Sequence, residues 1–502
     1  MSPLAQLHDH GQSFWLDSLS RQMLEDGSLA ERVRDQGLGG VTSNPAIFAK
    51  SMADSPLYDN RIRVALQTLG ASSAGGEESI EALAEPLYEQ LAVADVRDAC
   101  DLLLPVYQQS DGADGFVSLE VSPHLAFDAV NTMRGAHALW DAVGRPNLLI
   151  KVPGTSQGLH AVEELLYDGI NINITLLFGR DAYRETLQTY LRAMERRLDA
   201  GRDLRAVASV ASFFLSRIDV AVDAELAQRI DPSVEPRLRE EAESLLGRAA
   251  VANAQLAYRE FRDVLAEERW QRLAEQGARP QRVLWASTGT KNPDYSDVMY
   301  LEPLIGRHTV STMPEETAAA FEEHGRVEET LTGATAEAEQ VMEGLKRLGI
   351  DFDAITYQLV GEGVQKFIDP YDRLLQRLGE RAAQVQRAEQ ARPLADVAAR
   401  LRASAVRSTT EAGSGHATSA LSCADLVAAL FFHEMRWDPN APGERDMDRF
   451  LLSKGHAAPI LWAALDEAGA IDSDPLSLRR LDSDLEGHPT PVNPWVPAST
   501  GS

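Results

Sequence analysis

Lysine is scarce in this chain, and one lysine stands where a reactive amine would be useful. Only six of the 48 basic residues are lysines, which indicates that arginine is used wherever a generic cation is sufficient. Lys151 follows the apolar run 148–150 and precedes the segment VPGT. Arginine keeps its proton, whereas a desolvated lysine can lose its proton and attack a carbonyl carbon. Lys151 is therefore the candidate nucleophile, and the chemistry that it predicts is Schiff-base formation with a ketone.

Other polar residues occur at similar positions, each at the end of a short apolar segment. Asp17 and Glu120 could supply the proton transfers that carbinolamine dehydration and C–C bond cleavage require. The alternative is that both carboxylates form only a structural salt bridge with Lys151. The remaining polar residues at such ends are Asn44, Thr175, Ser212, Arg217, Ser287 and Lys291.

A barrel of parallel strands is the element arrangement that would bring these residues together. Short apolar runs alternate with amphipathic helical stretches, which is typical of βα units. The expected strands are residues 13–17, 39–43, 115–121, 147–152, 170–175, 206–211, 282–287 and 307–311. This count predicts a (β/α)₈ barrel with its active site at the carboxyl ends of the strands. An open doubly wound sheet is the alternative, but no G-x-G-x-x-G follows a strand.

The remaining organisation is helical. Residues 51–112 are expected to form inserted helices around the Gly/Ser stretch 71–79, and residues 181–200 and 232–278 are also expected to be helical. We expect the barrel to cover residues 1–375 and a linker helix to cover 376–395. A second domain, 396–502, follows the linker and has a different character.

The composition limits the partners and the compartment. The net charge of −28 argues against nucleic acid and anionic membranes as partners. Cys100 and Cys423 are far apart, so we expect neither disulfides nor a metal site but small buried thiols in a reducing cytoplasm. The N-terminus lacks the features of a signal peptide, and no apolar run has the length of a membrane span.

Several dispersed segments resemble those of the transaldolase family, most closely its longer bacterial form. In order along residues 1–375 these are WLDSLSRQML, GVTSNPAIF, VSLEVSP, LIKVPGT, INITLLF, ASFFLSRID and TMPEE. The resemblance implies transfer of a dihydroxyacetone unit between sugar phosphates, without a cofactor. It makes Lys151 the Schiff-base lysine and Asp17 the carboxylate that acts during C–C cleavage. Glu120 and Thr175 would hold a catalytic water.

The resemblance also assigns the residues that bind the substrate. Asn44 and Ser212 would contact the hydroxyls of the three-carbon unit, and Arg217 would bind phosphate. Ser287 and Lys291 lie where many transaldolases have a serine and a second arginine. A lysine can bind phosphate as a point charge, although the alternative for Lys291 is a solvated loop residue.

The C-terminal part resembles the beginning of a transketolase, an enzyme that uses thiamine diphosphate and Mg²⁺. The matching segments are SGHATSALSCADL, DRFLLSKGHAAPILWAAL and GHPTPVNPWVPASTGS. The resemblance makes His416, His456 and His488 the histidines that contact cofactor and substrate, in a site that is vestigial or incomplete. A transketolase would continue past STGS into the segments that hold the metal and activate the cofactor. We therefore expect no transketolase activity. We also expect a segment 480–502 that is loosely held or supported by a neighbouring chain, and possible self-association or pairing with a transketolase subunit.

Two other functions stay open. A direct aldolase would split fructose 6-phosphate without transfer, but Glu120 and Phe213 beside Ser212 favour transfer, because related aldolases differ at these points. A scaffold that tethers a transketolase is the non-enzymatic alternative, which the intact catalytic set disfavours.

Overall fold

The computed structural model describes residues 2–52, 55–69, 82–230, 235–391, 394–442 and 447–498. The described residues up to Ala382 form one compact unit, and those from Ala383 onward form a second. The chain passes from one unit to the other within the helix α17 (Phe352–Ala391). The Gly/Ser stretch 71–79 and Pro393, which falls within the expected linker helix 376–395, lie outside the described residues.

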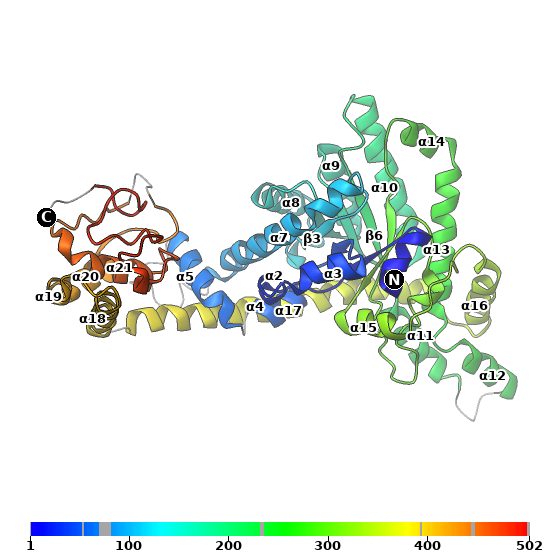
Figure 1. Ribbon diagram of the computed structural model, residues 1–502. Coiled ribbons are helices and arrows are strands. Elements are labelled where there is room, and N and C mark those ends of the chain that lie inside the picture. The colour runs from blue at the N-terminus through cyan, green and yellow to red at the C-terminus, as the bar shows by residue number, and fades with distance from the viewer. Residues whose placement is uncertain are drawn as a thin grey trace. The chain divides into compact units, whose positions relative to one another are not determined.

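The first unit contains a closed barrel of eight parallel strands in the order β1 to β8, with β8 paired to β1 (Figure 1). The strands are β1 Gln12–Leu16, β2 Gly40–Val41, β3 Phe116–Glu120, β4 Leu148–Pro153, β5 Ile172–Leu177, β6 Ser209–Phe214, β7 Arg282–Ala286 and β8 Thr309–Met313. Each strand overlaps one of the eight expected segments, so the predicted (β/α)₈ barrel is confirmed. Every strand residue except Arg282 is buried, because helices cover the outer face and side chains fill the interior.

Helices surround the strands, and capping side chains fix where several of them begin. Thr155 accepts the backbone N–H of Gly158 at the start of α9, and Asp128 accepts that of Asn131 at the start of α8. The helices of the barrel are α1 Pro3–Gln6, α2 Arg21–Glu25, α3 Ser28–Gln36, α8 Ala129–Val143, α9 Ser156–Asp168, α10 Arg180–Asp199, α11 Ser216–Ala227, α12 Pro236–Leu245, α13 Ala249–Ala266, α14 Glu268–Glu275, α15 Glu315–His324, α16 Thr335–Arg347 and α17.

The expected helical insertion lies between β2 and β3. It contains α4 Pro45–Met52, the 3₁₀ turn η2 Pro56–Tyr58, α5 Asp59–Thr68 and α7 Ala84–Gln109. A buried charged cluster anchors it to α2. The Arg21 guanidinium donates to Asp95 from its Nε at 2.9 Å and from its Nη2, and Tyr58 also donates to Asp95. Burial raises the pKa of Asp95, while the Tyr58 hydroxyl and Arg21 oppose this rise.

The second unit is helical, with no strand among its described residues. Its helices are α18 Leu394–Glu411, α19 Ala417–Ser422, α20 Ala424–Ala429 and α21 Ala458–Glu467, and they enclose a core that includes the fully buried Trp462. Gly413 and Gly415, both with positive φ, separate α18 from α19. The expectation of a loosely held tail is wrong for residues 480–498, because Leu485 and Val496 are buried in this core.

Two further observations concern the whole described chain. Both cysteine thiols are free, and Cys423 is half-buried rather than buried like Cys100. None of the helices in the described ranges combines the length and the apolar character that a membrane crossing requires.

Candidate active site

Eight of the nine predicted barrel residues line one cavity at the carboxyl ends of the strands. They are Asp17, Asn44, Lys151, Thr175, Ser212, Arg217, Ser287 and Lys291. The ninth, Glu120, reaches this site through its contact with Lys151. The residues that the sequence analysis missed are Thr42, Phe214, Ala286, Gly289, Thr312, Pro314 and Phe367.

Lys151 is held at the cavity by strand β4 and is almost completely enclosed. Only 5% of its side chain is exposed. Its Nζ donates to the backbone oxygen of Ser43 at 3.3 Å and lies 3.6 Å from Glu120 Oε2. The second distance is too long for a hydrogen bond but allows an ion pair. The Lys151 amine therefore has a charged neighbour to which it is not hydrogen-bonded.

Glu120 ends strand β3, and its carboxylate is buried with neither oxygen in a hydrogen bond to a described residue. Burial raises the pKa of Glu120 to about 7, while the Lys151 ammonium opposes this rise. A carboxyl group with a pKa near neutrality can both accept and donate a proton at physiological pH.

Thr175 contributes a second unpartnered polar atom, because its buried Oγ1 has no hydrogen-bond partner among the described residues. The next residue, Leu176, has a φ of 63°, and the pairing of β5 with β6 shifts register between Ile174 and Leu177. This irregularity changes the direction of strand β5 immediately after Thr175, at the edge of the cavity.

Asp17 is oriented by two threonines that the sequence analysis did not select. Thr42 Oγ1 donates to Asp17 Oδ1 at 2.7 Å and lies 2.7 Å from Thr312 Oγ1. The backbone N–H of Asp17 donates to Met313 O at 2.8 Å. The carboxylate is thus held between β2 and β8 while it remains part of the cavity wall.

The two predicted hydroxyl-binding residues are each held by a neighbour. Asn44 Oδ1 accepts the backbone N–H groups of Ala46 and Ile47 at the start of α4, which leaves its side-chain NH₂ as the available donor. Ser212 Oγ donates to Asn173 Oδ1 at 2.7 Å, so its oxygen can accept a hydrogen bond from a ligand.

Two further cations line the cavity besides Lys151. Arg217 Nη1 is buried without a hydrogen-bond partner among the described residues, and burial lowers the pKa of this guanidinium. Ser287 has a φ of 55° and shares a 2.8 Å hydrogen bond with Ser216. Lys291 is exposed at the edge of the cavity.

The aromatic residue of the motif SFF that faces the cavity is Phe214, not Phe213. Phe213 packs outside the barrel interior, where its ring contacts Tyr183 and Trp285 edge to face. Neighbouring residues of a strand point to opposite faces, so Ser212 and Phe214 line the cavity and Phe213 does not. The preference for transfer that the sequence analysis attached to Phe213 stays a prediction.

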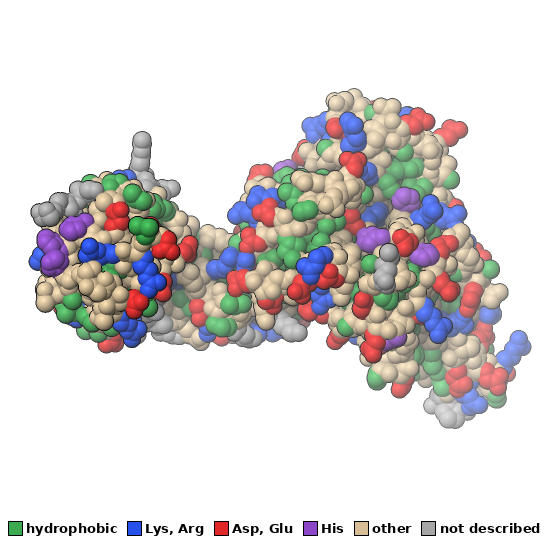
Figure 2. Space-filling view, in the orientation of Figure 1, with side chains coloured by type: hydrophobic (Ala, Val, Ile, Leu, Met, Phe, Trp, Pro, Cys, Tyr) green, Lys and Arg blue, Asp and Glu red, His purple; other side chains and the backbone are tan. Residues whose placement is uncertain are grey.

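The three predicted histidines of the C-terminal unit do come together. The ring centroids of His416 and His456 are 4.6 Å apart, and those of His456 and His488 are 5.4 Å apart. His456 Nδ1 is buried and unpartnered among the described residues. Figure 2 shows histidine side chains gathered on the surface of this unit.

The three histidines offer ring nitrogens and no oxygen ligand for a metal ion. The diphosphate of thiamine diphosphate is anchored through a metal ion, which needs carboxylate or carbonyl oxygens. The described residues contain no group of three His, Cys, Asp or Glu side chains able to hold a metal.

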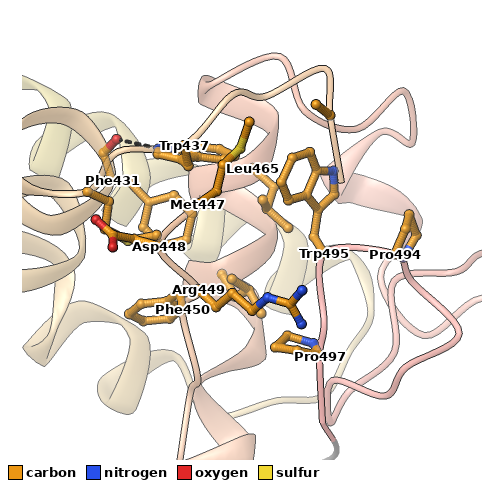
Figure 3. Close-up of a pocket in the computed structure, with 13 residues that line it drawn as sticks. Phe431, Trp437, Met447, Asp448, Arg449, Phe450, Leu465, Pro494, Trp495 and Pro497 are labelled. Carbon is orange, nitrogen blue, oxygen red and sulfur yellow. Dashed lines mark hydrogen bonds between the residues drawn. The ribbon is translucent and has the colours of Figure 1, made fainter. Parts of the chain in front are cut away.

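A separate cavity in the C-terminal unit is aromatic and contains none of the three histidines (Figure 3). Trp437 and Trp495 pack perpendicular to each other with centroids 5.1 Å apart, and Trp437 Nε1 donates to Phe431 O at 2.9 Å. Asp448 and Arg449 supply the charges at this cavity.

Comparison with known proteins finds a family model for each of the two units. The family model described as "Transaldolase/Fructose-6-phosphate aldolase" matches residues 14–378, and the one described as "Transketolase, thiamine diphosphate binding domain" matches residues 394–502. A transaldolase of Thiobacillus denitrificans is 46% identical over 370 residues, which cover 74% of this chain and 97% of that protein. A transaldolase 2 of a Nostoc species is 43% identical over 382 residues, covering 75% and 96%. A transaldolase of Frankia alni is 44% identical over 375 residues, covering 74% and 96%. With a barrel, a buried lysine and relatives matched over nearly their whole length, the chain belongs to the transaldolase family.

Proposed function

We propose that this chain transfers a dihydroxyacetone unit between sugar phosphates through a Schiff base on Lys151. The reaction interconverts sedoheptulose 7-phosphate plus glyceraldehyde 3-phosphate with erythrose 4-phosphate plus fructose 6-phosphate, in the non-oxidative pentose phosphate pathway. The observation that carries the proposal is the buried Lys151 amine, 3.6 Å from Glu120 Oε2, at a cavity that Asp17 and Arg217 also line. The two free thiols are consistent with a cytoplasmic location.

In the first half of the reaction, the Lys151 amine attacks the ketone carbon C2 of the donor. The carbinolamine that forms loses water and becomes an imine. Glu120 and Thr175 hold the water that carries protons between the amine, the departing oxygen and solvent. Their buried and unpartnered oxygen atoms support this role, because buried polar atoms require partners and a bound water can supply them.

In the second half, Asp17 accepts the proton of the C4 hydroxyl while the C3–C4 bond breaks. The electron pair of that bond moves to the imine, which leaves an enamine on Lys151 and releases the aldose phosphate. The enamine then attacks the aldehyde carbon of the acceptor, and Asp17 returns the proton to the new hydroxyl. Water finally hydrolyses the imine and restores the free amine.

The remaining residues bind rather than react. Asn44 donates from its side-chain NH₂ and Ser212 accepts at its Oγ, so together they can bind two hydroxyls of the three-carbon unit. Arg217, Ser287 and Lys291 bind the phosphate at the other end. The unpartnered Arg217 Nη1 supports this assignment, because a guanidinium and phosphate form strong charge-assisted hydrogen bonds.

A direct aldolase is the second candidate, since the matching family model covers both activities in its description. Such an enzyme would release free dihydroxyacetone from fructose 6-phosphate when no acceptor is present.

The proposal is tested by trapping with borohydride in the presence of fructose 6-phosphate. Peptide mass spectrometry is expected to find a reduced three-carbon adduct on Lys151, together with loss of activity. Lys151→Arg should form no adduct and lose several orders of magnitude in kcat. An adduct on another lysine, or normal turnover by Lys151→Arg, would refute the assignment. Release of free dihydroxyacetone at the rate of transfer would favour the direct aldolase.

A further inference from the structure

One wall of the cavity comes from a helix rather than from a strand end. Phe367 of α17 is only 7% exposed and lines the cavity. Its ring centroid lies 5.5 Å from Lys151 Nζ and 5.7 Å from the central guanidinium carbon of Arg217. Both distances are within the range of cation–π attraction.

Arg217, whose Nη1 is buried, is held differently from the buried Arg21. Arg21 is fixed by the carboxylates of Asp95 and Asp98. Arg217 has instead two aromatic neighbours, because the ring of Phe214 lies 5.3 Å from its guanidinium and Phe367 approaches as well. Glu120 and Asp17 favour its charged form by their charges, yet neither forms an ion pair with it within the described residues.

This arrangement has a specific consequence for ligand binding. A carboxylate that paired with Arg217 would occupy N–H donors that an anionic ligand needs. An aromatic face attracts a cation through its π-electrons and leaves the guanidinium N–H groups free. The two rings can therefore hold the guanidinium in place while its donors remain available.

A close helix–strand approach fixes Phe367 itself. Gly363 lies one turn before it on α17, and a Cβ at Gly363 would meet Leu176 Cδ2 at 3.0 Å and Phe178 Cε2 at 3.4 Å. The absence of a side chain at this position lets α17 come close to the end of β5, which brings Phe367 to the cavity.

We infer that Phe367 is a positioning residue that orients Arg217 toward the phosphate of the substrate. The inference rests on the proposed function, since it requires Arg217 to bind phosphate. Phe367 does not contact the phosphate itself but acts through the guanidinium. The alternative is that Phe367 only fills space in the wall of the cavity.

The test compares donors with and without phosphate in variants that keep or remove the aromatic ring. Phe367→Leu should lower kcat/KM for fructose 6-phosphate by about 3- to 30-fold, mostly through KM, because a desolvated cation–π contact is lost. It should change kcat/KM for fructose much less. Phe367→Tyr, which keeps the ring, should restore the phosphate preference. Phe321→Leu, a matched loss of a buried ring on α15, should change neither value. Equal loss on both donors, or no rescue by tyrosine, would mean that Phe367 is only a packing residue.

A double-mutant cycle separates this inference from the proposed function. Arg217→Ala should itself remove the preference for phosphorylated donors, and adding Phe367→Leu should then have no further effect on that preference. If Arg217→Ala leaves the preference intact, the proposed phosphate role is wrong. If Arg217→Ala removes it but the single Phe367→Leu variant keeps the full preference, the phosphate role stands and the positioning role of Phe367 is wrong.

Discussion

Glu120 and Lys151 are register partners on the neighbouring strands β3 and β4, and their charged ends lie 3.6 Å apart in the barrel. The pairing of two strands thus determines the distance between amine and carboxylate. No loop is needed to place the Lys151 amine beside the Glu120 carboxylate. The pair is therefore formed before any substrate binds.

The pH dependence of the reaction should report Glu120. Since burial raises the pKa of Glu120 to about 7, this group is mostly a carboxylate above that pH and mostly protonated below it. Only the carboxylate can accept the proton that Lys151 must lose, so kcat/KM should fall as pH decreases through about 7.

Glu120→Gln should lose most activity and should abolish this acidic limb in the remaining activity. Asp219 provides a matched control, because burial raises the pKa of this carboxyl to about 6 although it lies outside the cavity. Asp219→Asn should keep the limb. A limb that persists in Glu120→Gln would contradict the prediction.

The two cations at the phosphate end should contribute unequally. Arg217→Ala should lower kcat/KM for phosphorylated donors by about 10- to 100-fold, the value of a charge-assisted hydrogen bond. Lys291→Ala should have a smaller effect that disappears at high salt, because Lys291 is exposed and solvent screens its charge. Steady-state kinetics at two ionic strengths provide the measurement.

The buried contact of Arg21 with Asp95, which anchors the inserted helices to α2, should contribute more to stability than an exposed ion pair does. Arg21→Met leaves the buried Asp95 carboxylate without its main partner and should lower the free energy of unfolding by about 3–5 kcal/mol. Adding Asp95→Asn should recover a large part of this loss. Arg34→Met, which removes an exposed ion pair with Asp35, should have a much smaller effect in the same denaturant titration. Equal losses in Arg21→Met and Arg34→Met would contradict the role of burial.

Two glycines on one helix turn provide a matched pair for the approach of α17 to the barrel. Gly361→Ala has open space around its new Cβ and should leave activity unchanged while stabilising the helix slightly. Gly363→Val should push α17 away from Leu176 and lower the preference for phosphorylated donors. The same phosphorylated and unphosphorylated substrates check both variants, and identical behaviour would refute this explanation.

The C-terminal unit should be dispensable for transfer. All residues that line the cavity precede Phe367 or are that residue, so deleting residues 396–502 should keep kcat within about threefold, or about 0.6 kcal/mol. The 502-residue chain should not cleave xylulose 5-phosphate when thiamine diphosphate and Mg²⁺ are added. Cofactor-dependent cleavage of that substrate would overturn this prediction.

The barrel could be predicted from the sequence because each strand is a short apolar run that helical sequence follows. Lys151 and Glu120 could be selected because they end such runs, and strand ends meet at one face of the barrel. Thr42 could also have been selected from the sequence, since it lies two residues before Asn44. Phe367 could not have been selected, because the sequence does not distinguish a phenylalanine of an amphipathic helix that lines a cavity from one that packs in the core. Only the packing of α17 against the end of β5 brings it to the cavity.

The buried polar atoms of the cavity also affect the stability of the folded protein. Glu120 and Thr175 each bury oxygen atoms that no described residue satisfies, so the proposed water must supply their partners, and selection for stability alone would favour an apolar site instead. A trade-off between catalytic activity and thermal stability follows. Thr175→Val, which has nearly the same shape, is expected to make the enzyme more heat-resistant and less active. If Thr175→Val does unfold at a higher temperature, the site that holds the catalytic water limits the thermal stability of this protein.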